Sequence, residues 1–390
     1  MTYDFDEVID RQGTNSVKWD YRKDAFGRDD VLPMWVADMD FESPPEVKRA
    51  ILKYASKGVY AYFRRPATYY SSIIDWVSDR HGWNIDRDWI VSTRGVINAI
   101  NLAVLSYTSP RDKILIQTPV YSPFYSAVKN NNRELILNSL IEKDGYYTMD
   151  FEDLEYKLKD GVKMIILCNP HNPVGRVWNL EELKRLEGLC KEYDVVLISD
   201  EIHSDIIYDG HRHIPIASLS SDIARRTVTC ISASKTFNIA GLDESVIIIS
   251  NSKLRERFIQ TMEGAGIGGG NIFGTMATEA AYSYGVNWLE DLLIYFQGNL
   301  KYLNKRIKES RAPVRFHMPE GTYLVWLDFR DMGICGDDLT KFLIDEARLG
   351  LNDGRGFGEE GDGYMRMNIA CPRSTLRDGV NRLLTAISRI

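Results

Sequence analysis

A lysine that follows a short β-branched segment is the residue of this chain best placed to do covalent chemistry. Lys235 lies in the run Ser232-Ala233-Ser234-Lys235-Thr236-Phe237, directly after the apolar segment Thr227–Ile231. A lysine is normally protonated at neutral pH, but one held among hydroxyls at the end of a buried strand can form a Schiff base with an aldehyde cofactor. Taken alone, Lys235 is more simply interpreted as a surface lysine, so the residues at neighbouring strand ends decide the question.

The central region alternates short apolar segments with longer segments of helical period, which is typical of parallel strands covered by crossover helices. We predict strands at Lys113–Gln117, Lys163–Leu167, Val195–Ser199, Thr227–Ile231 and Ser245–Ile249. We predict helices over Val96–Tyr107, Leu180–Tyr193 and Lys253–Glu263. Ligands of such a sheet collect beyond the carboxyl ends of its strands. The side chains expected there are those of Tyr121, Asn172, Asp200 and Lys235.

These residue types are those that a pyridoxal phosphate site requires. Asp200 can keep the ring nitrogen protonated, which makes the ring a stronger electron sink. Tyr121 can stack on the ring, although aromatic residues at such positions are often core residues, and Asn172 can donate to the phenolic oxygen. His203 follows Asp200 closely, and a structural role and a supporting role near the ring are about equally expected.

The phosphate and the substrate carboxylate also have candidate partners. Gly95 and Val96 open a predicted helix, and the free amides of a helix N-terminus bind phosphate. Ser232 and Ser234 could add hydroxyl groups, although serines after strands often only form turns. Arg366 lies on an apparent strand. It could form an ion pair within the protein, but its planar guanidinium suits a substrate carboxylate, and we favour that role. The substrate is then an amino acid.

The chain of 390 residues is long enough for about two domains. We predict an α/β fold whose large domain, residues 41–286, contains a mostly parallel sheet. Residues 287–390 are predicted to form a smaller α+β domain, with a long helix at Trp288–Ser310 and a strand at Tyr323–Phe329. Residues 1–40 are predicted to form an N-terminal arm that completes part of the small domain.

Composition excludes several classes of protein. The net charge is −7 with no long basic run, so neither nucleic acid nor an anionic membrane is an expected partner. Five scattered cysteines without a C-x-x-C motif argue against a disulfide framework or a zinc site. The sequence shows no export signal and no run of eighteen apolar residues. We therefore expect a cytoplasmic protein.

Two further patterns favour ordinary structural interpretations. His211 and His213 resemble a metal-binding pair but lack a third ligand nearby, so a solvated loop and no metal site are expected. The glycine-rich run Gly264–Gly270 follows a helical segment rather than a strand, so it is not a dinucleotide-binding loop. A loop at an active site or interface is the better interpretation.

Several motifs resemble one family across nearly the whole chain. The chain resembles the fold-type-I pyridoxal-phosphate enzymes of the class I/II aminotransferase superfamily, and within them the cystathionine β-lyase/cystalysin group of carbon–sulfur lyases. N-P-x-N-P-x-G and S-x-x-K are shared with aminotransferases. The motifs of the lyase group are Trp35-Val36-Ala37-Asp38-Met39-Asp40-Phe41, His171-Asn172-Pro173-Val174-Gly175-Arg176-Val177-Trp178 and Asp200-Glu201-Ile202-His203.

The resemblance implies a homodimer with shared active sites, in which Tyr62 of one subunit reaches the phosphate at the other. It also implies that Ala37, Asn172 and Arg366 contact the substrate. Asp243 stands where aminotransferases usually keep a phosphate-binding arginine, which weakens the aminotransferase interpretation. Arg94 and Ser122 also depart from the family pattern and could change the substrate preference.

The expected activity is cleavage of L-cystathionine or a related cysteine S-conjugate to a thiol, pyruvate and ammonia. Lys235 would remove the α-proton and Tyr121 would assist proton transfer near the sulfur. One alternative is an aminotransferase that uses the same lysine, aspartate and arginine. An alternative of another class is a catalytically silent protein that keeps the fold to bind a ligand or a regulatory partner. The sequence does not identify the leaving thiol.

Overall fold

The computed structural model describes residues 3–268 and 270–389. The first two residues of the predicted N-terminal arm, Gly269 of the glycine-rich run and Ile390 lie outside the described residues. The centre of the molecule is a seven-stranded sheet in the order β2-β10-β9-β8-β7-β3-β4. Its strands are β2 (Ile90–Thr93), β3 (Lys113–Thr118), β4 (Glu134–Ser139), β7 (Met164–Cys168), β8 (Val196–Asp200), β9 (Thr227–Ile231) and β10 (Ser245–Ile248).

The sheet is mostly parallel, as predicted, and its predicted strands lie within one residue of the observed ones. Strands β4, β3, β7, β8 and β9 run parallel to one another. Strand β10 instead pairs antiparallel with both β9 and β2. The interior strands are apolar and buried, which is expected where helices cover both faces of a sheet.

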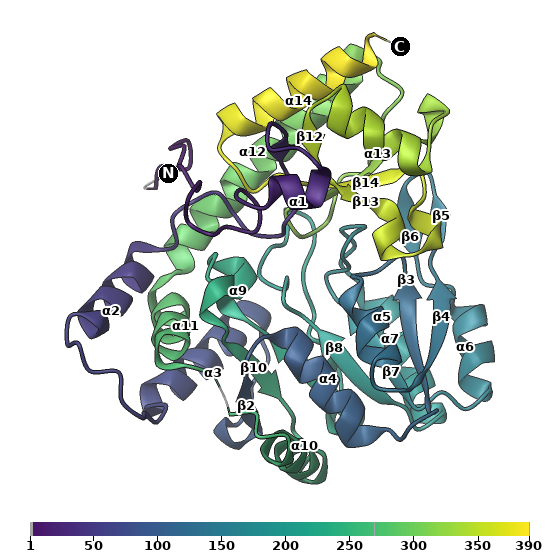
Figure 1. The fold of residues 1–390 in the computed structure, drawn as a ribbon. Coiled ribbons are helices and arrows are strands. Elements are labelled where there is room, and N and C mark those ends of the chain that lie inside the picture. Colours follow the sequence, from purple (N-terminus) through teal and green to yellow (C-terminus); the bar gives the residue numbers. More distant parts are fainter. Residues whose placement is uncertain (1–2, 269, 390) are drawn as a thin grey trace.

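Helices cover both faces of the sheet (Figure 1). One buried cluster joins the sheet to α4 (Val96–Tyr107), α5 (Pro123–Lys129) and α10 (Ser252–Gly264). A second joins it to α6 (Phe151–Lys159), α7 (Leu180–Glu192) and α8 (Ser221–Arg226). Helix α7 begins at a capping box, in which Asn179 and Glu182 exchange hydrogen bonds with each other's backbone. The helices α2 (Pro45–Ala55), α3 (Ala67–His81) and α11 (Ile272–Tyr284) pack against one another.

The C-terminal region forms a second, smaller sheet. Strand β14 (Tyr364–Asn368) pairs antiparallel with β11 (Leu324–Asp328) and β13 (Asn352–Asp353). Around it lie the long α12 (Val286–Ser310), α13 (Gly336–Asp345) and α14 (Arg373–Ile387). A short hairpin of β5 (Ile141–Lys143) and β6 (Tyr146–Thr148) reaches toward this region from the large sheet (Figure 1).

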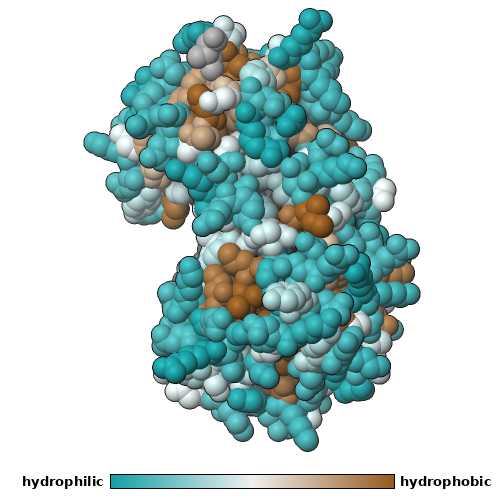
Figure 2. Space-filling view, turned by 90° about the vertical axis from the view of Figure 1, so that its right-hand side faces the viewer, coloured by the Kyte–Doolittle hydropathy of each residue, from teal (hydrophilic) through white to brown (hydrophobic). Residues whose placement is uncertain are grey.

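The N-terminal segment lies against the C-terminal elements. Strand β1 (Leu32–Pro33) pairs in parallel with β12 (Leu349–Gly350), and α1 (Arg22–Phe26) lies beside them (Figure 1). This pairing agrees in kind with an arm that completes the smaller domain, although the division at residues 40 and 286 stays a prediction. Figure 2 shows a largely hydrophilic face, hollowed on one side between its upper and lower parts. Among the described residues, no helix is both long and apolar enough to cross a membrane.

Candidate active site

A cavity of about 350 Å³ lies at the carboxyl ends of the strands. Most of the residues selected from the sequence line it, although they come from segments far apart in the chain. These are Ala37, Gly95, Val96, Tyr121, Asn172, Asp200, His203, Ser234 and Lys235. Ser232, Arg366 and Tyr62 do not line it.

Lys235 is held on α9 (Ala233–Thr236), a single helical turn that follows β9. Ser232 caps this turn by accepting a hydrogen bond from the Ser234 amide at 3.1 Å, and its hydroxyl donates to the Glu244 carbonyl at 2.8 Å. Lys235 Nζ donates to the Ala37 carbonyl at 2.7 Å. Burial is the main reason that the pKa of Lys235 falls to about 8, which makes the neutral amine accessible near physiological pH.

Asp200 ends β8 and is a buried carboxylate that none of the described lysine, arginine or histidine side chains contacts through a hydrogen bond. Its Oδ1 accepts one hydrogen bond, from the Ile202 amide at 3.1 Å. Burial, with a smaller contribution from the charge of Glu201, raises the pKa of Asp200 to about 7, although that hydrogen bond and the charge of Lys235 both lower it. A bound cation would reverse this shift, so the site is suited to a protonated ring nitrogen.

Arg366 and Asn172 are joined although 194 residues separate them. Arg366 Nη1 donates to Asn172 Oδ1 at 2.9 Å, and Nη2 donates to Asn352 Oδ1 at 2.6 Å and to the Trp35 carbonyl at 3.1 Å. None of these acceptors is a carboxylate, and the buried Nε has no hydrogen-bond acceptor among the described residues. Burial lowers the pKa of Arg366 to about 10. The guanidinium therefore retains capacity for an anionic ligand.

Tyr121 and His203 both line the cavity. Tyr121 contributes a phenol and His203 contributes a neutral imidazole. Burial raises the pKa of Tyr121 above its usual value. Burial, with the charges of Lys235 and Arg366, lowers the pKa of His203 to about 3. Because His203 is neutral and its buried Nδ1 has no hydrogen-bond partner among the described residues, it can serve a ligand as donor or acceptor but not as a cation.

The start of α4 also lines the cavity. Gly95 has φ +79° and precedes Val96, and no side chain caps this helix. Its amides are therefore available to an anion. The cavity is also lined by Arg94, Asp243 and Glu244. Glu244 accepts from Arg65 Nη2 at 2.8 Å, so a fixed cation already meets its charge.

Tyr62 is fully exposed, on the segment that connects α2 to α3, and contacts nothing in the cavity of its own chain. The role expected for Tyr62 requires a second subunit and stays a prediction.

The prediction that His213 lies in a solvated loop is wrong. His213 is buried, and its Nε2 lies 2.9 Å from Glu201 Oε2. Among the described residues, no group of three or more His, Cys, Asp or Glu side chains is placed to hold a metal ion.

Two residues that influence the surroundings of Lys235 were not selected from the sequence. Tyr323 donates to the same Ala37 carbonyl as Lys235, at 2.9 Å, and its buried ring lies edge-on to His203. The charge of Asp38 acts on Lys235. Tyr323 was placed on a predicted strand and Asp38 in a recognised motif, but neither pattern shows which group faces the lysine.

A buried hydrogen-bond network around Asp205 contacts Thr236, the residue that follows Lys235. Asp205 accepts hydrogen bonds from Thr236 Oγ1 at 2.7 Å and Trp76 Nε1 at 3.1 Å, and His81 Nε2 lies 3.1 Å from it. Burial alone would raise the pKa of Asp205, but His81 and these donors hold it below its usual value. This His81–Asp205 network fixes the residue that follows Lys235.

The donors and acceptors of the cavity fit pyridoxal phosphate. An accessible lysine amine, a buried carboxylate without a cation and an uncapped helix N-terminus match its aldehyde, ring nitrogen and phosphate. Together with the large mostly parallel sheet, they define an enzyme of the fold-type-I pyridoxal-phosphate class. Residues 29–383 match the family described as Aminotransferase class I and II, and the chain belongs to that family.

Individual relatives cover almost the whole chain. The chain is 43% identical to cystathionine β-lyase PatB of Bacillus subtilis, over 98% of this chain and 100% of that protein. It is 34% identical to Protein MalY of Escherichia coli, over 100% of both chains. The structure superposes with a TM-score of 0.97 on cystalysin of Treponema denticola, which contains a pyridoxal 5'-phosphate cofactor, at 37% identity over 100% of both chains.

A solved PLP-bound C-S lyase from Staphylococcus hominis is also similar. The TM-score is 0.93 at 36% identity, and the match covers 99% of this chain and 98% of that one. The resemblance to the lyase group drawn from the motifs is thereby confirmed.

Proposed function

We propose that this protein is a pyridoxal-phosphate-dependent carbon–sulfur β-lyase. Its substrate is L-cystathionine or a related cysteine S-conjugate, and its products are a thiol, pyruvate and ammonia. The observation that carries the pyridoxal-phosphate chemistry is the presence, in one cavity, of Lys235, whose pKa is lowered, and Asp200, whose pKa is raised. The similarity to cystathionine β-lyase PatB supports the reaction type.

Lys235, Asp200 and the start of α4 would hold the cofactor. When bound, pyridoxal phosphate supplies an aldehyde for covalent attachment of an amine and a ring that accepts the electrons of a broken bond at the α-carbon. Asp200 would hold the protonated ring nitrogen, and the amides at Gly95 and Val96, with the Ser234 hydroxyl, would hold the phosphate. Ser232 acts on this site as the cap of the Lys235 turn.

Arg366 would bind the substrate carboxylate, oriented by its hydrogen bonds to Asn172 and Asn352. The amine of Lys235 is then positioned to remove the α-proton, for which a pKa of about 8 is well suited. Tyr121 would exchange a proton with the leaving sulfur. His203 stays neutral beside the site, so it adds no charge that would oppose a cationic ring nitrogen.

The active form is proposed to be a homodimer in the cytoplasm. The fully exposed Tyr62 supports this arrangement, since an aromatic side chain without contacts in its own chain is available to a second subunit. Cross-linking or analytical ultracentrifugation tests the dimer. In a dimer, mixing Lys235→Ala chains with Tyr62→Phe chains should restore one normal site per heterodimer.

The reaction is tested by adding cystathionine or an S-alkyl cysteine to the purified protein loaded with pyridoxal phosphate. Continuous release of thiol and pyruvate without a keto acid is expected. An aminotransferase would instead need a keto-acid co-substrate for sustained turnover. A protein that takes up no cofactor, as judged by the absence of a visible absorbance band, would contradict both enzymatic assignments and favour a binding role.

A further inference from the structure

The segment Trp35–Asp40, part of the W-V-A-D-M-D-F motif, passes between the two residues on which the proposed reaction depends. We refer to residues 35–40 as the strap. Its Ala37 carbonyl accepts from Lys235 Nζ at 2.7 Å, and its Trp35 carbonyl accepts from Arg366 Nη2 at 3.1 Å. Asn368 Nδ2 donates to the carbonyls of Val36 and Asp38, at 2.6 Å each. The strap therefore connects the Lys235 turn, which follows β9, with strand β14 through its backbone.

A cluster of four charges holds the strap in place. Arg11 binds Asp38 Oδ2 through Nη2 and Asp40 Oδ1 through Nη1, each at 2.7 Å. Lys18 Nζ, which is 1% exposed, lies 2.6 Å from Asp40 Oδ2 and 3.6 Å from Asp38 Oδ1. Trp19 Nε1 adds a hydrogen bond to Asp40 Oδ1 at 2.9 Å. Two cations and two carboxylates thus tie the N-terminal arm to the strap.

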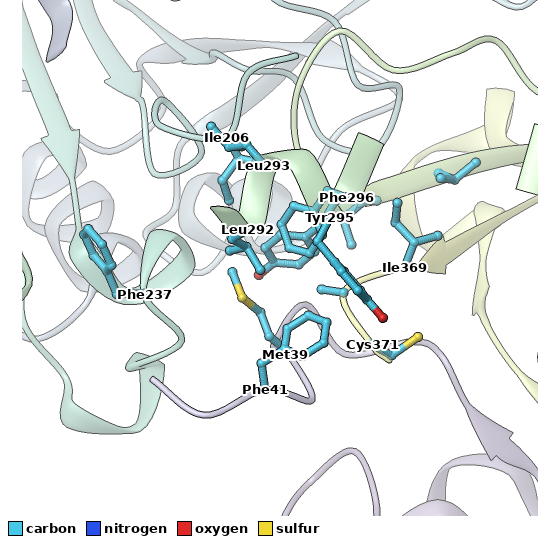
Figure 3. Packing of buried hydrophobic residues seen from close by; sticks show 14 of the residues in the cluster. Met39, Phe41, Ile206, Phe237, Leu292, Leu293, Tyr295, Phe296, Ile369 and Cys371 are labelled. Carbon is cyan, nitrogen blue, oxygen red and sulfur yellow. The ribbon is translucent and has the colours of Figure 1, made fainter. Parts of the chain in front are cut away.

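The apolar side chains of the motif anchor the same segment in the core. Met39 and Phe41 are buried and point into a cluster with Phe296 and Ile369 (Figure 3). Asn238, three residues after Lys235, binds the Met39 amide and carbonyl at 3.0 Å each. Alternation along the strap therefore places apolar side chains in the core and Asp38 and Asp40 toward Arg11.

We propose that Arg11 and Asp38 are positioning residues: Arg11 holds the strap so that its Ala37 carbonyl accepts from the free amine of Lys235, and the Arg11–Asp38 ion pair sets the net charge beside that amine. Arg11 fixes the strap by bridging two of its carboxylates, and Asp38 lies directly beyond the carbonyl that accepts the amine. This inference rests on the proposed role of Lys235. It assigns a function in the reaction to Arg11 and Asp38, which do not line the cavity themselves.

The charges that surround Lys235 come from several elements. Asp38 on the strap and Asp200 on β8 favour its protonated form, whereas Arg366 on β14 opposes it. His203 is neutral and Tyr323 shares the acceptor of the amine. Burial is the largest influence and lowers the pKa of Lys235. The negative charge of Asp38 acts against burial and raises this pKa.

This arrangement predicts effects of opposite sign for the two members of one ion pair. Asp38→Asn removes a negative charge near the amine, so the pKa of Lys235 should fall. Arg11→Met removes the cation that neutralises Asp38, so the pKa of Lys235 should rise. Each shift is expected to be on the order of half a pH unit. General loosening of the strap would move both variants in the same direction, so the signs separate charge from structure.

The test uses cofactor-free full-length protein and follows the reaction of Lys235 with pyridoxal, an aldehyde without phosphate. Only the neutral amine reacts, so the rate rises with pH to a plateau, and the midpoint reports the pKa of Lys235. Lys235→Ala protein supplies the blank. We expect the midpoint of Asp38→Asn below, and that of Arg11→Met above, the midpoint of the unmodified protein.

Asp30→Asn is the matched control, because it removes an exposed carboxylate of the same arm that pairs with Arg28 at 2.8 Å. It should leave the midpoint unchanged. Arg11→Lys should restore the normal midpoint, and it keeps the test available where Asp38→Asn does not fold. Equal midpoints, or shifts of the same sign, in folded variants would overturn the inference. Failure of the unmodified protein to react would instead contradict the role of Lys235 itself.

Discussion

The cavity around Lys235 and the His81–Asp205 network behind it contain similar groups in different states of pairing. Asp200 in the cavity receives one backbone hydrogen bond, and burial raises its pKa to about 7. Asp205 receives hydrogen bonds from Thr236 and Trp76 and lies beside His81, and its pKa is below the usual value. An unpaired buried charge is costly to a fold. The cavity retains such an unpaired charge, whereas the network does not. The cavity is therefore suited to bind a ligand, and the network is suited to stabilise the fold.

The largest effect is expected on the cavity side of this comparison. Lys235→Ala should reduce turnover by about 10⁴-fold, since it removes both the attachment point of the cofactor and the general base. The visible absorbance band of lysine-bound cofactor should disappear while far-UV circular dichroism stays normal. A variant that retains the band and the turnover would break the assignment.

Removal of Asp205 should act mainly on stability. Asp205→Ala leaves His81, Thr236 and Trp76 without their buried acceptor, so we expect a loss of about 3–5 kcal/mol in the free energy of unfolding. Urea denaturation of the cofactor-free protein measures it. A loss below about 1 kcal/mol would show that the network is not the paired counterpart of the cavity.

The corresponding change in the cavity should have the reverse signature. Asp200→Asn is expected to lower kcat about 10²-fold, because the ring nitrogen loses its anionic partner. The free energy of unfolding without cofactor should be unchanged or higher, since a buried unpaired carboxylate is removed. Measuring kcat and the free energy of unfolding in the same preparation allows a direct comparison with Asp205→Ala. A strongly destabilised Asp200→Asn protein would contradict the expected difference between the cavity and the network.

A smaller effect is expected from a change of Arg366, which tests whether the cavity binds the substrate carboxylate. Arg366→Lys keeps the charge but loses the planar guanidinium, so KM for the amino-acid substrate should rise about 10- to 100-fold. The visible absorbance of bound cofactor should be nearly unaffected. Equal KM values for the two proteins would exclude Arg366 as the carboxylate-binding residue.

The smallest expected effect per step of the experiment, here one pH unit, is a pH dependence of stability in the cofactor-free protein. Asp200 has a pKa of about 7 in the folded chain against an ordinary value of 3.8. Between these values the folded protein holds a proton that the unfolded chain has released. Stability contributed by Asp200 therefore falls as pH rises through this window, by up to roughly 1 kcal/mol per pH unit. The difference between unmodified and Asp200→Asn protein isolates this slope, and an equal slope in both would contradict it.

The interior of the large sheet was predictable because its strands are continuous apolar segments bounded by turns. Strand β9 and helix α4 have the predicted bounds. The edge strand β4 was missed because exposed and buried positions mix along it. The antiparallel direction of β10 was not predictable, since a buried strand has the same composition in either direction.

The candidate site divides in the same way. Most residues selected at strand ends line one cavity, since parallel strands end at a common edge. Ser232 instead caps the Lys235 turn, and His213 is buried against Glu201. Local spacing cannot distinguish a serine that faces a ligand from one that faces a backbone amide. Nor can it show that a histidine in a polar loop will find a buried carboxylate.

The sequence by itself determined the fold class, the family and the chemical type of the residues at the strand ends. These properties follow from local periodicity and from motifs a few residues long. Only the tertiary structure decided that Ala37 accepts from both Lys235 and Tyr323, that Arg366 binds Asn172, and that Arg11 holds the strap. The first three of these contacts join residues 194 to 286 positions apart, and Arg11 lies 27 positions from Asp38. Their energies depend on burial and on the other charges present, and neither exists until the chain has folded.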